Sequence, residues 1–206
     1  MYARTTTIEA TPSSLDAGIA YVRDTVMPVL EGLEGHIGLS LVADRSSGRC
    51  IITSAWESED AMRASASAVE DVRNRAAEIF GGASPTVDEW EIAVLHRDHE
   101  AGAGACVRVT WATVDTDQID AGLEVFKSAL PALQELEGFC SASLLVDRTS
   151  GRGVSSMAFA SADAMERNRG EMDRLRGSMS EEAAAQIREE HDFELMIAHL
   201  RVPEMA

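Results

Sequence analysis

The stretch DRSSGR at residues 44–49 returns almost unchanged as DRTSGR at residues 147–152, which is 103 residues later. A second stretch, LEG at residues 33–35, returns at residues 136–138 with the same separation of 103 residues. A period of this length is far too long for a solenoid repeat and matches the size of a small domain. The sequence therefore predicts two similar domains in one chain.

The separation between the two copies changes along the chain. Near the start, the stretch DAG at residues 16–18 returns at residues 120–122, a separation of 104 residues. The first helix of the second copy therefore lacks one residue that the first copy has. We divide the chain into a first repeat at residues 1–97, a linker of small residues at 98–105, and a second repeat at 106–202.

Both copies show the same order of expected elements, read from hydrophobic periodicity and turn residues. In the first copy we expect strands at 2–10, 36–44, 49–57 and 86–96, and helices at 12–35 and 58–80. In the second copy we expect strands at 106–114, 139–147, 152–160 and 190–200, and helices at 116–137 and 161–187. Thr11 and Ser58 are the expected N-caps of the helices in the first copy.

This order of elements predicts the fold class. A strand–helix–strand–strand–helix–strand unit forms a four-stranded antiparallel sheet with two helices on one face. The other face carries Val107, Val109 and Trp111 in the second copy, and it needs a cover because a wet apolar face is unfavourable. We therefore predict an α+β fold of two ferredoxin-like repeats packed sheet to sheet as an intramolecular pseudo-dimeric barrel.

Composition restricts the class of partner. The formal net charge is −17, whereas nucleic acids and anionic membranes attract basic surfaces, so we expect neither as a partner. The chain has three cysteines and no CxxC pair, which is typical of a reducing compartment. It shows no apolar signal-peptide core and no apolar run of about 20 residues. We therefore predict a cytoplasmic protein.

The residues at the turns and helix starts resemble the antibiotic-biosynthesis-monooxygenase-like family of dimeric α+β barrels. The resemblance rests on LEGH at 33–36 and WESEDA at 56–61, and on LEGF at 136–139 and FASADA at 159–164. The resemblance implies the barrel fold predicted above. The family includes cofactor-independent monooxygenases of aromatic polyketides and quinols, and also haem-degrading enzymes, so the fold by itself does not define the reaction.

Haem degradation is disfavoured by the residues that stand at the positions used in that branch of the family. The resemblance places the haem-site asparagine at Thr6 and Thr110, and the histidine ligand at Arg73 and Arg176. An arginine remains protonated at any working pH and cannot ligate iron. We therefore expect no haem, no metal site and no other cofactor.

Recurring arginines define the candidate pocket. Arg4 and Arg108 lie on the first strands, on the side that faces the helices in the family, and Arg73 and Arg176 from the second helices can face the same space. With the neighbouring threonines, the candidate pocket residues are Arg4, Thr6, Arg73, Arg108, Thr110 and Arg176. Such arginines can hold an anion or a carbonyl oxygen. The alternative is that they pair with helix carboxylates or lie on solvated helix faces.

Two other features have structural interpretations. His36 has the ordinary pKa of a general base, but the second copy has Phe139 at this position, which indicates a packing position. The repeated turn at 44–49 joins two strands, whereas a phosphate-binding loop precedes a helix. Its glycine is therefore expected to provide a positive φ angle.

Two functions remain open at this point. One is a small-molecule-binding protein. If this protein is an enzyme, we expect a cofactor-free monooxygenase that acts on a quinol or a polyketide-like aromatic. The other is a non-catalytic barrel that binds a ligand or a partner. A helix–sheet gap of about 300 Å³ or more with converging polar groups would favour the first, and only one copy need keep it. Both a monomeric pseudo-dimer and a homodimer are compatible with the sequence.

Overall fold

The computed structural model describes residues 1–200 and 203–205 of the 206-residue chain. By their contacts these residues form two compact units. Unit 1 contains Met1–Trp90 and the described part of Glu194–Val202, and unit 2 contains Glu91–Phe193 and the described part of Pro203–Ala206. Residues 201 and 202, the end of the predicted second repeat, lie outside the described residues.

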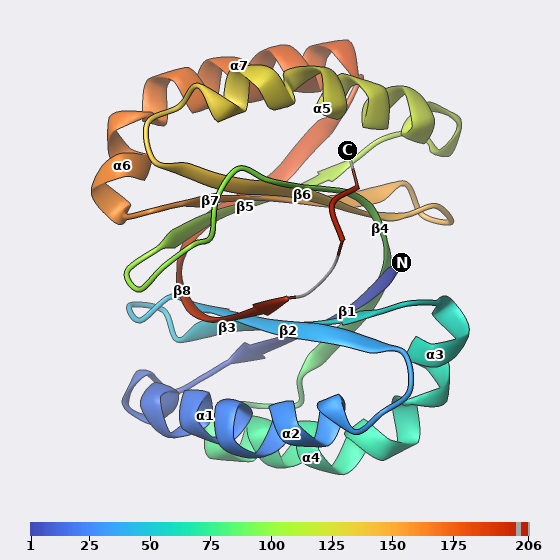
Figure 1. Cartoon of the computed structure of the whole chain (residues 1–206), viewed down its shortest axis with the longest axis vertical. Helices are drawn as coiled ribbons and strands as arrows, with labels where there is room; N and C mark the ends of the chain where they lie inside the picture. Colours follow the sequence, from blue (N-terminus) through green and yellow to red (C-terminus); the bar gives the residue numbers. More distant parts are fainter. Residues whose placement is uncertain (201–202, 206) are drawn as a thin grey trace. The chain divides into compact units, whose positions relative to one another are not determined.

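Unit 1 has helices on one face of its sheet (Figure 1). Its strands are β1 (Tyr2–Glu9), β2 (His36–Ala43), β3 (Arg49–Trp56), the beginning of β4 (Thr86–Arg97) and the end of β8 (Gln186–Leu200). Its helical segments are a 3₁₀ turn (Pro12–Ser14), α1 (Leu15–Tyr21), a π-helical turn (Val22–Val26), α2 (Met27–Glu31), α3 (Glu59–Ala64) and α4 (Ala66–Ile79). The apolar stripe of α1 and α2 packs on the sheet together with α4, and this contact forms the core of the unit.

Unit 2 repeats this arrangement. Its strands are β5 (Cys106–Thr113), β6 (Phe139–Asp147), β7 (Arg152–Phe159), the beginning of β8 and the end of β4. Its helical segments are a 3₁₀ turn (Thr116–Gln118), α5 (Ile119–Gln134), α6 (Ala162–Arg167) and α7 (Arg169–Glu182). Helices α5 and α7 cover one face of the sheet (Figure 1), and the buried residues of α5 recur at helical spacing.

The predicted α+β fold of ferredoxin-like repeats is confirmed. The hydrogen-bonded strand order is closed and runs β1-β3-β2-β8-β5-β7-β6-β4. Each long last strand begins in its own unit and ends in the other: β4 pairs with β6 from Glu91 onward, and β8 pairs with β2 from Glu194 onward. The end of each last strand therefore belongs to the other compact unit. For this reason the compact units differ from the repeats at 1–97 and 106–202, which are defined by sequence similarity.

The π-helical turn explains why the separation between the repeats changes. Leu15 and Ile119 begin the first long helices and are 104 residues apart, whereas Glu31 and Gln134 end them and are 103 apart. A π-helical turn accommodates one residue more than an α-helical turn. The extra residue of the first copy is therefore absorbed at Val22–Val26, while α5 continues without interruption.

The repeated turn has the structural role expected of it. The Asp44 carboxylate accepts a hydrogen bond from the backbone N–H of Ser46 at 2.8 Å. Gly48 has a φ of +86°, and a Cβ there would lie 2.0 Å from the carbonyl oxygen of Ala10. Gly151 occupies the same place in the second copy with a φ of +72°. Glycine is therefore required both by the backbone conformation and by the close approach of the segment that follows β1.

The helix ends agree in part with the sequence. Ser58 caps α3, since its hydroxyl accepts a hydrogen bond from the Ala61 backbone N–H at 3.1 Å. Thr11 occupies the N-cap position of the first helical turn, but its side chain makes no capping hydrogen bond, and its hydroxyl donates to the carbonyl oxygen of Gly81 at 3.2 Å instead. This bond ties the start of the first helical segment to the end of α4.

The helix predicted at 161–187 ends earlier than expected. It is interrupted at Asn168, between α6 and α7, and α7 ends at Glu182. Ala184 then adopts a left-handed conformation with a φ of 51°, and β8 begins at Gln186. The run of alanines favours a helix by propensity, but the pairing of β8 with the sheet overrides that preference.

His36 and Phe139 occupy equivalent packing positions. The ring centroids of His36 and Trp56 lie 5.2 Å apart in an edge-to-face arrangement, and those of Phe139 and Phe159 lie 6.0 Å apart in the same arrangement. Burial lowers the pKa of His36 below its ordinary value of 6.5. The folded protein therefore favours the neutral form of this ring more than the unfolded chain does, in agreement with the packing interpretation.

We expect His36→Phe to reduce the acid sensitivity of the fold. The unfolded chain protonates this histidine near pH 6.5, whereas the folded chain resists protonation, so the stabilisation is present above pH 6.5 and is lost as the pH falls. The free energy of unfolding, measured in urea between pH 8 and pH 5, should fall less steeply for the variant than for the wild type. His99→Gln, at a more exposed histidine, is the control, and equal slopes for wild type and His36→Phe would contradict the expectation.

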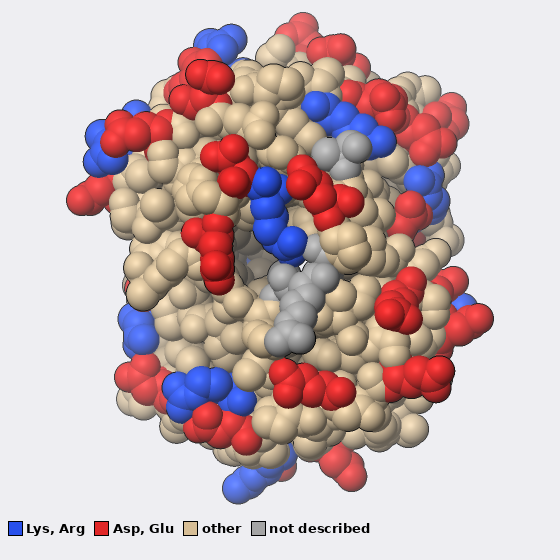
Figure 2. Space-filling view, viewed as in Figure 1, with Lys and Arg blue, Asp and Glu red and all other residues tan. Residues whose placement is uncertain are grey.

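Acidic side chains are spread over the face seen in Figure 2, with basic side chains between them. None of the helices within residues 1–200 and 203–205 has both the length and the apolar character that a membrane crossing requires.

Candidate functional site

Unit 2 contains a cavity of about 130 Å³ between its helices and its sheet. Most of its wall is apolar and comes from β5, β6, β7, α5 and α7. Three methionines, Met157, Met172 and Met179, belong to this wall and provide unbranched, adaptable side chains. One corner is polar and contains Arg108, which lies on β5.

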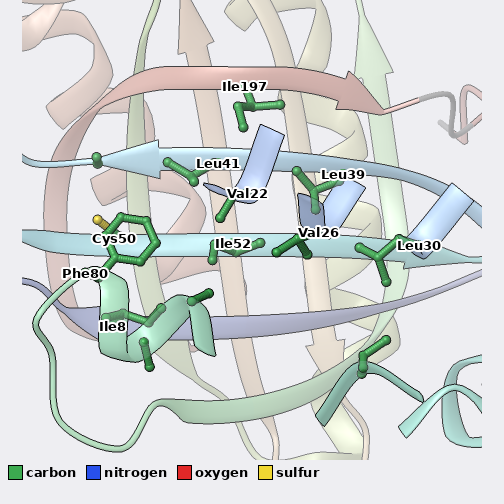
Figure 3. Packing of buried hydrophobic residues seen from close by; sticks show 14 of the residues in the cluster. Ile8, Val22, Val26, Leu30, Leu39, Leu41, Cys50, Ile52, Phe80 and Ile197 are labelled. Atoms are coloured by element: carbon green, nitrogen blue, oxygen red, sulfur yellow. The ribbon is translucent and has the colours of Figure 1, made fainter. Parts of the chain in front are cut away.

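The cavity exists because unit 2 has small residues where unit 1 has large ones. In unit 1, Phe80 is fully buried, and a Cβ added at Gly18 would lie only 2.2 Å from its ring. Figure 3 shows the Phe80 ring close to Cys50 and Ile8 in the apolar cluster of unit 1. By the repeat separations, the corresponding residues of unit 2 are Ala183, Gly153 and Ala112, and all three line the cavity.

The equivalent space in unit 1 is smaller. It is a cavity of about 40 Å³, lined by residues that include Arg4, Thr6 and Arg73. This volume is close to the share of liquid volume that one water molecule takes, about 30 Å³. Unit 1 therefore has no room at this place for a ligand of more than a few atoms.

Arg108 and Asp192 form the centre of the polar corner. The Arg108 side chain is only 4% exposed. Its Nε and Nη2 donate to the two carboxylate oxygens of Asp192, each at 2.7 Å. This paired hydrogen bond is the strong, planar form of the arginine–carboxylate contact. It raises the pKa of Arg108 further, so the guanidinium is charged at all working pH values.

A second ion pair completes the corner. Arg176 of α7 pairs through Nη1 with Glu190 of β8, and its Nη2 lies 3.1 Å from Asp173. The Thr110 hydroxyl donates to Glu190 at 3.1 Å. The guanidinium groups of Arg108 and Arg176 thus face the three carboxylates of Asp173, Glu190 and Asp192, and Nη2 of Arg169 lies 3.8 Å from Asp192. The corner as a whole carries no surplus positive charge.

The first strand of unit 1 has the same arginine, with each of its guanidinium nitrogens hydrogen-bonded. Arg4 donates from Nη2 to Glu89 at 2.8 Å and to the Met62 carbonyl oxygen at 2.7 Å. Its Nη1 donates to the Ser65 hydroxyl at 3.0 Å. Every terminal nitrogen of this guanidinium has a protein acceptor.

The corner of unit 2 leaves one donor without an acceptor. Asn168 replaces Ser65 at this position, and its amide donates to the carbonyl oxygens of Glu137 and Ala164 at 2.9 and 2.8 Å. Nη1 of Arg108 is buried and has no hydrogen-bond partner within the described part of the chain. An unsatisfied buried donor of this kind costs free energy and needs an explanation.

The structure distributes the residues predicted for the pocket between the two units. Arg108, Thr110 and Arg176 line the cavity of unit 2. Their counterparts Arg4, Thr6 and Arg73 line the smaller space in unit 1. The carboxylates that pair with Arg4 and Arg108 come from the last strands β4 and β8, whereas the sequence interpretation placed them on helices.

Sequence reasoning missed Ala183, Glu190 and Asp192. The signal for Ala183 was available, because the repeat aligns it with Phe80. Among the described residues, no group of three or more histidine, cysteine, aspartate or glutamate side chains is placed to hold a metal ion.

A family profile described as antibiotic biosynthesis monooxygenase matches residues 1–70. The chain is 57% identical over 206 residues to uncharacterized protein Rv2557 of Mycobacterium tuberculosis, strain H37Rv. That match covers 100% of this chain and 92% of the relative. The similarity therefore extends over both repeats.

Solved structures share the fold at low sequence identity. An anthrone oxidase-like protein is 15% identical with a TM-score of 0.70, and the match covers 100% of this chain and 94% of that protein. The heme-degrading enzyme LmHde of Listeria monocytogenes is 11% identical with a TM-score of 0.55, covering 94% of this chain and 99% of that chain. At these identities the comparison extends to the fold alone.

Proposed function

The chain belongs to the antibiotic biosynthesis monooxygenase family, and from that premise we propose that unit 2 binds a small aromatic molecule in the cavity beside Ala183. The single observation that carries the proposal is the space left where unit 1 has Phe80. That space is mostly apolar, with charged side chains at the corner of Arg108 and at Arg152 of β7, a combination suited to a ring with one or two polar substituents.

The cavity is smaller than the gap of about 300 Å³ that we expected from the sequence for a small-molecule site, and its volume restricts the ligand to one ring. The cavity measures about 130 Å³, and a protein cavity of about 150 Å³ is enough to bind benzene. Sites for larger molecules begin at about 300 Å³. A single-ring phenol or quinol fits this size, whereas a polyketide with several fused rings would require the helices to move apart.

For the reaction we propose oxygenation of a quinol-type ring without a cofactor. In such chemistry the bound substrate itself supplies electrons to oxygen. The protein contributes a dry cavity and a donor that stabilises negative charge developing on the substrate oxygen. Arg108 and Arg176 are the candidates for that donor, because both line the cavity.

The proposal is tested by oxygen uptake and by binding in parallel. Hydroquinone and methylhydroquinone are incubated with the purified chain in an oxygen electrode, and thermal shifts are recorded with the same compounds and with toluene. We expect uptake that saturates with quinol concentration and exceeds the uncatalysed rate. If no single-ring compound shifts the unfolding temperature, the proposed site is wrong.

A non-catalytic ligand-binding role is the second candidate. Its support is that the carboxylates of the corner are all engaged by Arg108, Thr110 or Arg176, which leaves no free base at the cavity. Binding of single-ring compounds without oxygen uptake would favour this role.

A further inference from the structure

We infer that the cavity of unit 2 selects neutral ring compounds that carry one hydrogen-bond acceptor, and that Nη1 of Arg108 is the donor that recognises the acceptor. This inference rests on the proposed function, since it names the class of molecule that the same cavity takes. It makes Arg108 a specificity-determining residue and leaves its counterpart Arg4 with a structural role.

The comparison between the two repeats supplies the first argument. Arg4 and Arg108 each use Nε and Nη2 for a carboxylate of the last strand. In unit 1 the remaining nitrogen is satisfied by the Ser65 hydroxyl at 3.0 Å. In unit 2 the same nitrogen is enclosed and lacks an acceptor, and the Arg108 side chain to which it belongs forms part of the cavity wall. A ligand oxygen would give Nη1 of Arg108 the acceptor that Ser65 gives to Nη1 of Arg4.

The charges around the corner supply the second argument. Asp192 holds Arg108, and Glu190 and Asp173 hold Arg176. The charges of Arg108 and Arg176 are therefore already paired with carboxylates. A carboxylate or phosphate ligand in this corner would be repelled by those three carboxylates. A neutral carbonyl oxygen avoids this repulsion and still accepts a hydrogen bond from the charged guanidinium. The corner thus disfavours the acidic ligands that the arginines alone would have suggested.

The wall of the cavity allows the acceptor to approach. Nη1 is enclosed, so a ligand oxygen must come within about 2.9 Å of it as the neighbouring side chains adjust. Met157 and Met172 belong to the same wall and are unbranched, so they adjust at lower cost than branched side chains. Toluene needs no such contact and should occupy only the apolar part.

The experiment uses three probes that share one ring: toluene, benzaldehyde and benzoate. They are titrated into the full chain carrying ¹³C-methyl methionine, where the methyl signals of Met157, Met172 and Met179 report on the cavity. We expect benzaldehyde to bind about tenfold more tightly than toluene, as one charge-assisted hydrogen bond predicts. Benzoate should bind more weakly than benzaldehyde by at least a similar factor.

Asn168→Ser provides the matched variant, because it places in unit 2 the residue that satisfies Arg4 in unit 1. We expect it to remove the preference for benzaldehyde over toluene while leaving toluene binding unchanged. Ser65→Asn makes the reverse change in unit 1 and should leave all three affinities as in the wild type.

The outcomes separate the two proposals. If none of the probes binds, the proposed function fails. If toluene binds and benzaldehyde binds no better, the ligand cavity stands and the role of Arg108 is overturned. Benzoate binding as tightly as benzaldehyde would also overturn it, since the charge argument would then be wrong. The three probes give this result on the wild type even if Asn168→Ser does not fold.

Discussion

Ala183→Phe is expected to abolish ligand binding in unit 2. A phenylalanine at the corresponding position of unit 1 is fully buried and packs on Gly18. Unit 2 keeps a glycine there, Gly122, and a Cβ added to it would lie 3.8 Å from the Ala183 Cβ. The ring therefore has room and would occupy the space that we assign to the ligand. Titration with toluene, followed by the methionine methyl signals, should show an affinity loss of about 100-fold or more, since the ligand must displace a buried ring.

Graded and distant substitutions serve as controls. Ala183→Val fills only part of the space and should give an intermediate affinity. Ser178→Ala, at an exposed position of α7, should leave binding unchanged. If Ala183→Phe folds and binds toluene as the wild type does, the ligand site lies elsewhere in the chain. The free energy of unfolding, measured in urea, shows whether the variant is folded.

Because the sequence repeats, both the order of the elements and the position of one extra residue could be predicted. The same order of expected elements in both copies indicated a ferredoxin-like unit, and the change in separation near residues 16–18 located one extra residue in the first helix. What the sequence did not show was how this residue is accommodated. A π-helical turn and a loop insertion have the same effect on an alignment, and only backbone hydrogen bonding distinguishes them.

The cavity was harder to predict because volume is not visible in hydrophobic periodicity. Phe80 and Ala183 both count as apolar residues at the end of a helix, so the pattern is the same in the two copies. The repeat aligns Ala183 with Phe80, but this difference in size indicates a cavity only when Gly18 and Gly122 are known to lie opposite these residues. Packing density in a core is decided by such three-dimensional neighbours.

The partners of the arginines illustrate a second limit. The sequence suggested carboxylates on helices for Arg4 and Arg108, because the helices are rich in acidic residues. The topology instead places β4 beside β1 and β8 beside β5, so Glu89 and Asp192 are the nearest carboxylates. Strand order is a long-range property, and the spacing of residues within one element does not contain it.

Phe80→Ala is expected to destabilise the chain strongly and to create in unit 1 the cavity that unit 2 already has. Phe80 is 0% exposed, and it packs in the cluster that contains Ile8 and Cys50. Removing such a ring costs about 3–5 kcal/mol through lost burial and the cavity left behind. Urea unfolding should show this loss. Saturating toluene should then raise the unfolding temperature of the variant more than that of the wild type, because a second site binds it.

The controls separate the ring from general effects of substitution. Phe80→Leu fills part of the space and should lose less than the alanine variant, and it remains measurable if the alanine variant does not fold. Val29→Ala changes a side chain that is 37% exposed and should lose well under about 1 kcal/mol. A loss below about 1 kcal/mol for Phe80→Ala would mean that unit 1 closes around the missing ring. In that case the packing of α1 and α4 on the sheet, and not the Phe80 ring, would prevent a ligand-sized cavity in unit 1. The small side chain of Ala183 would then not be enough to explain the cavity in unit 2.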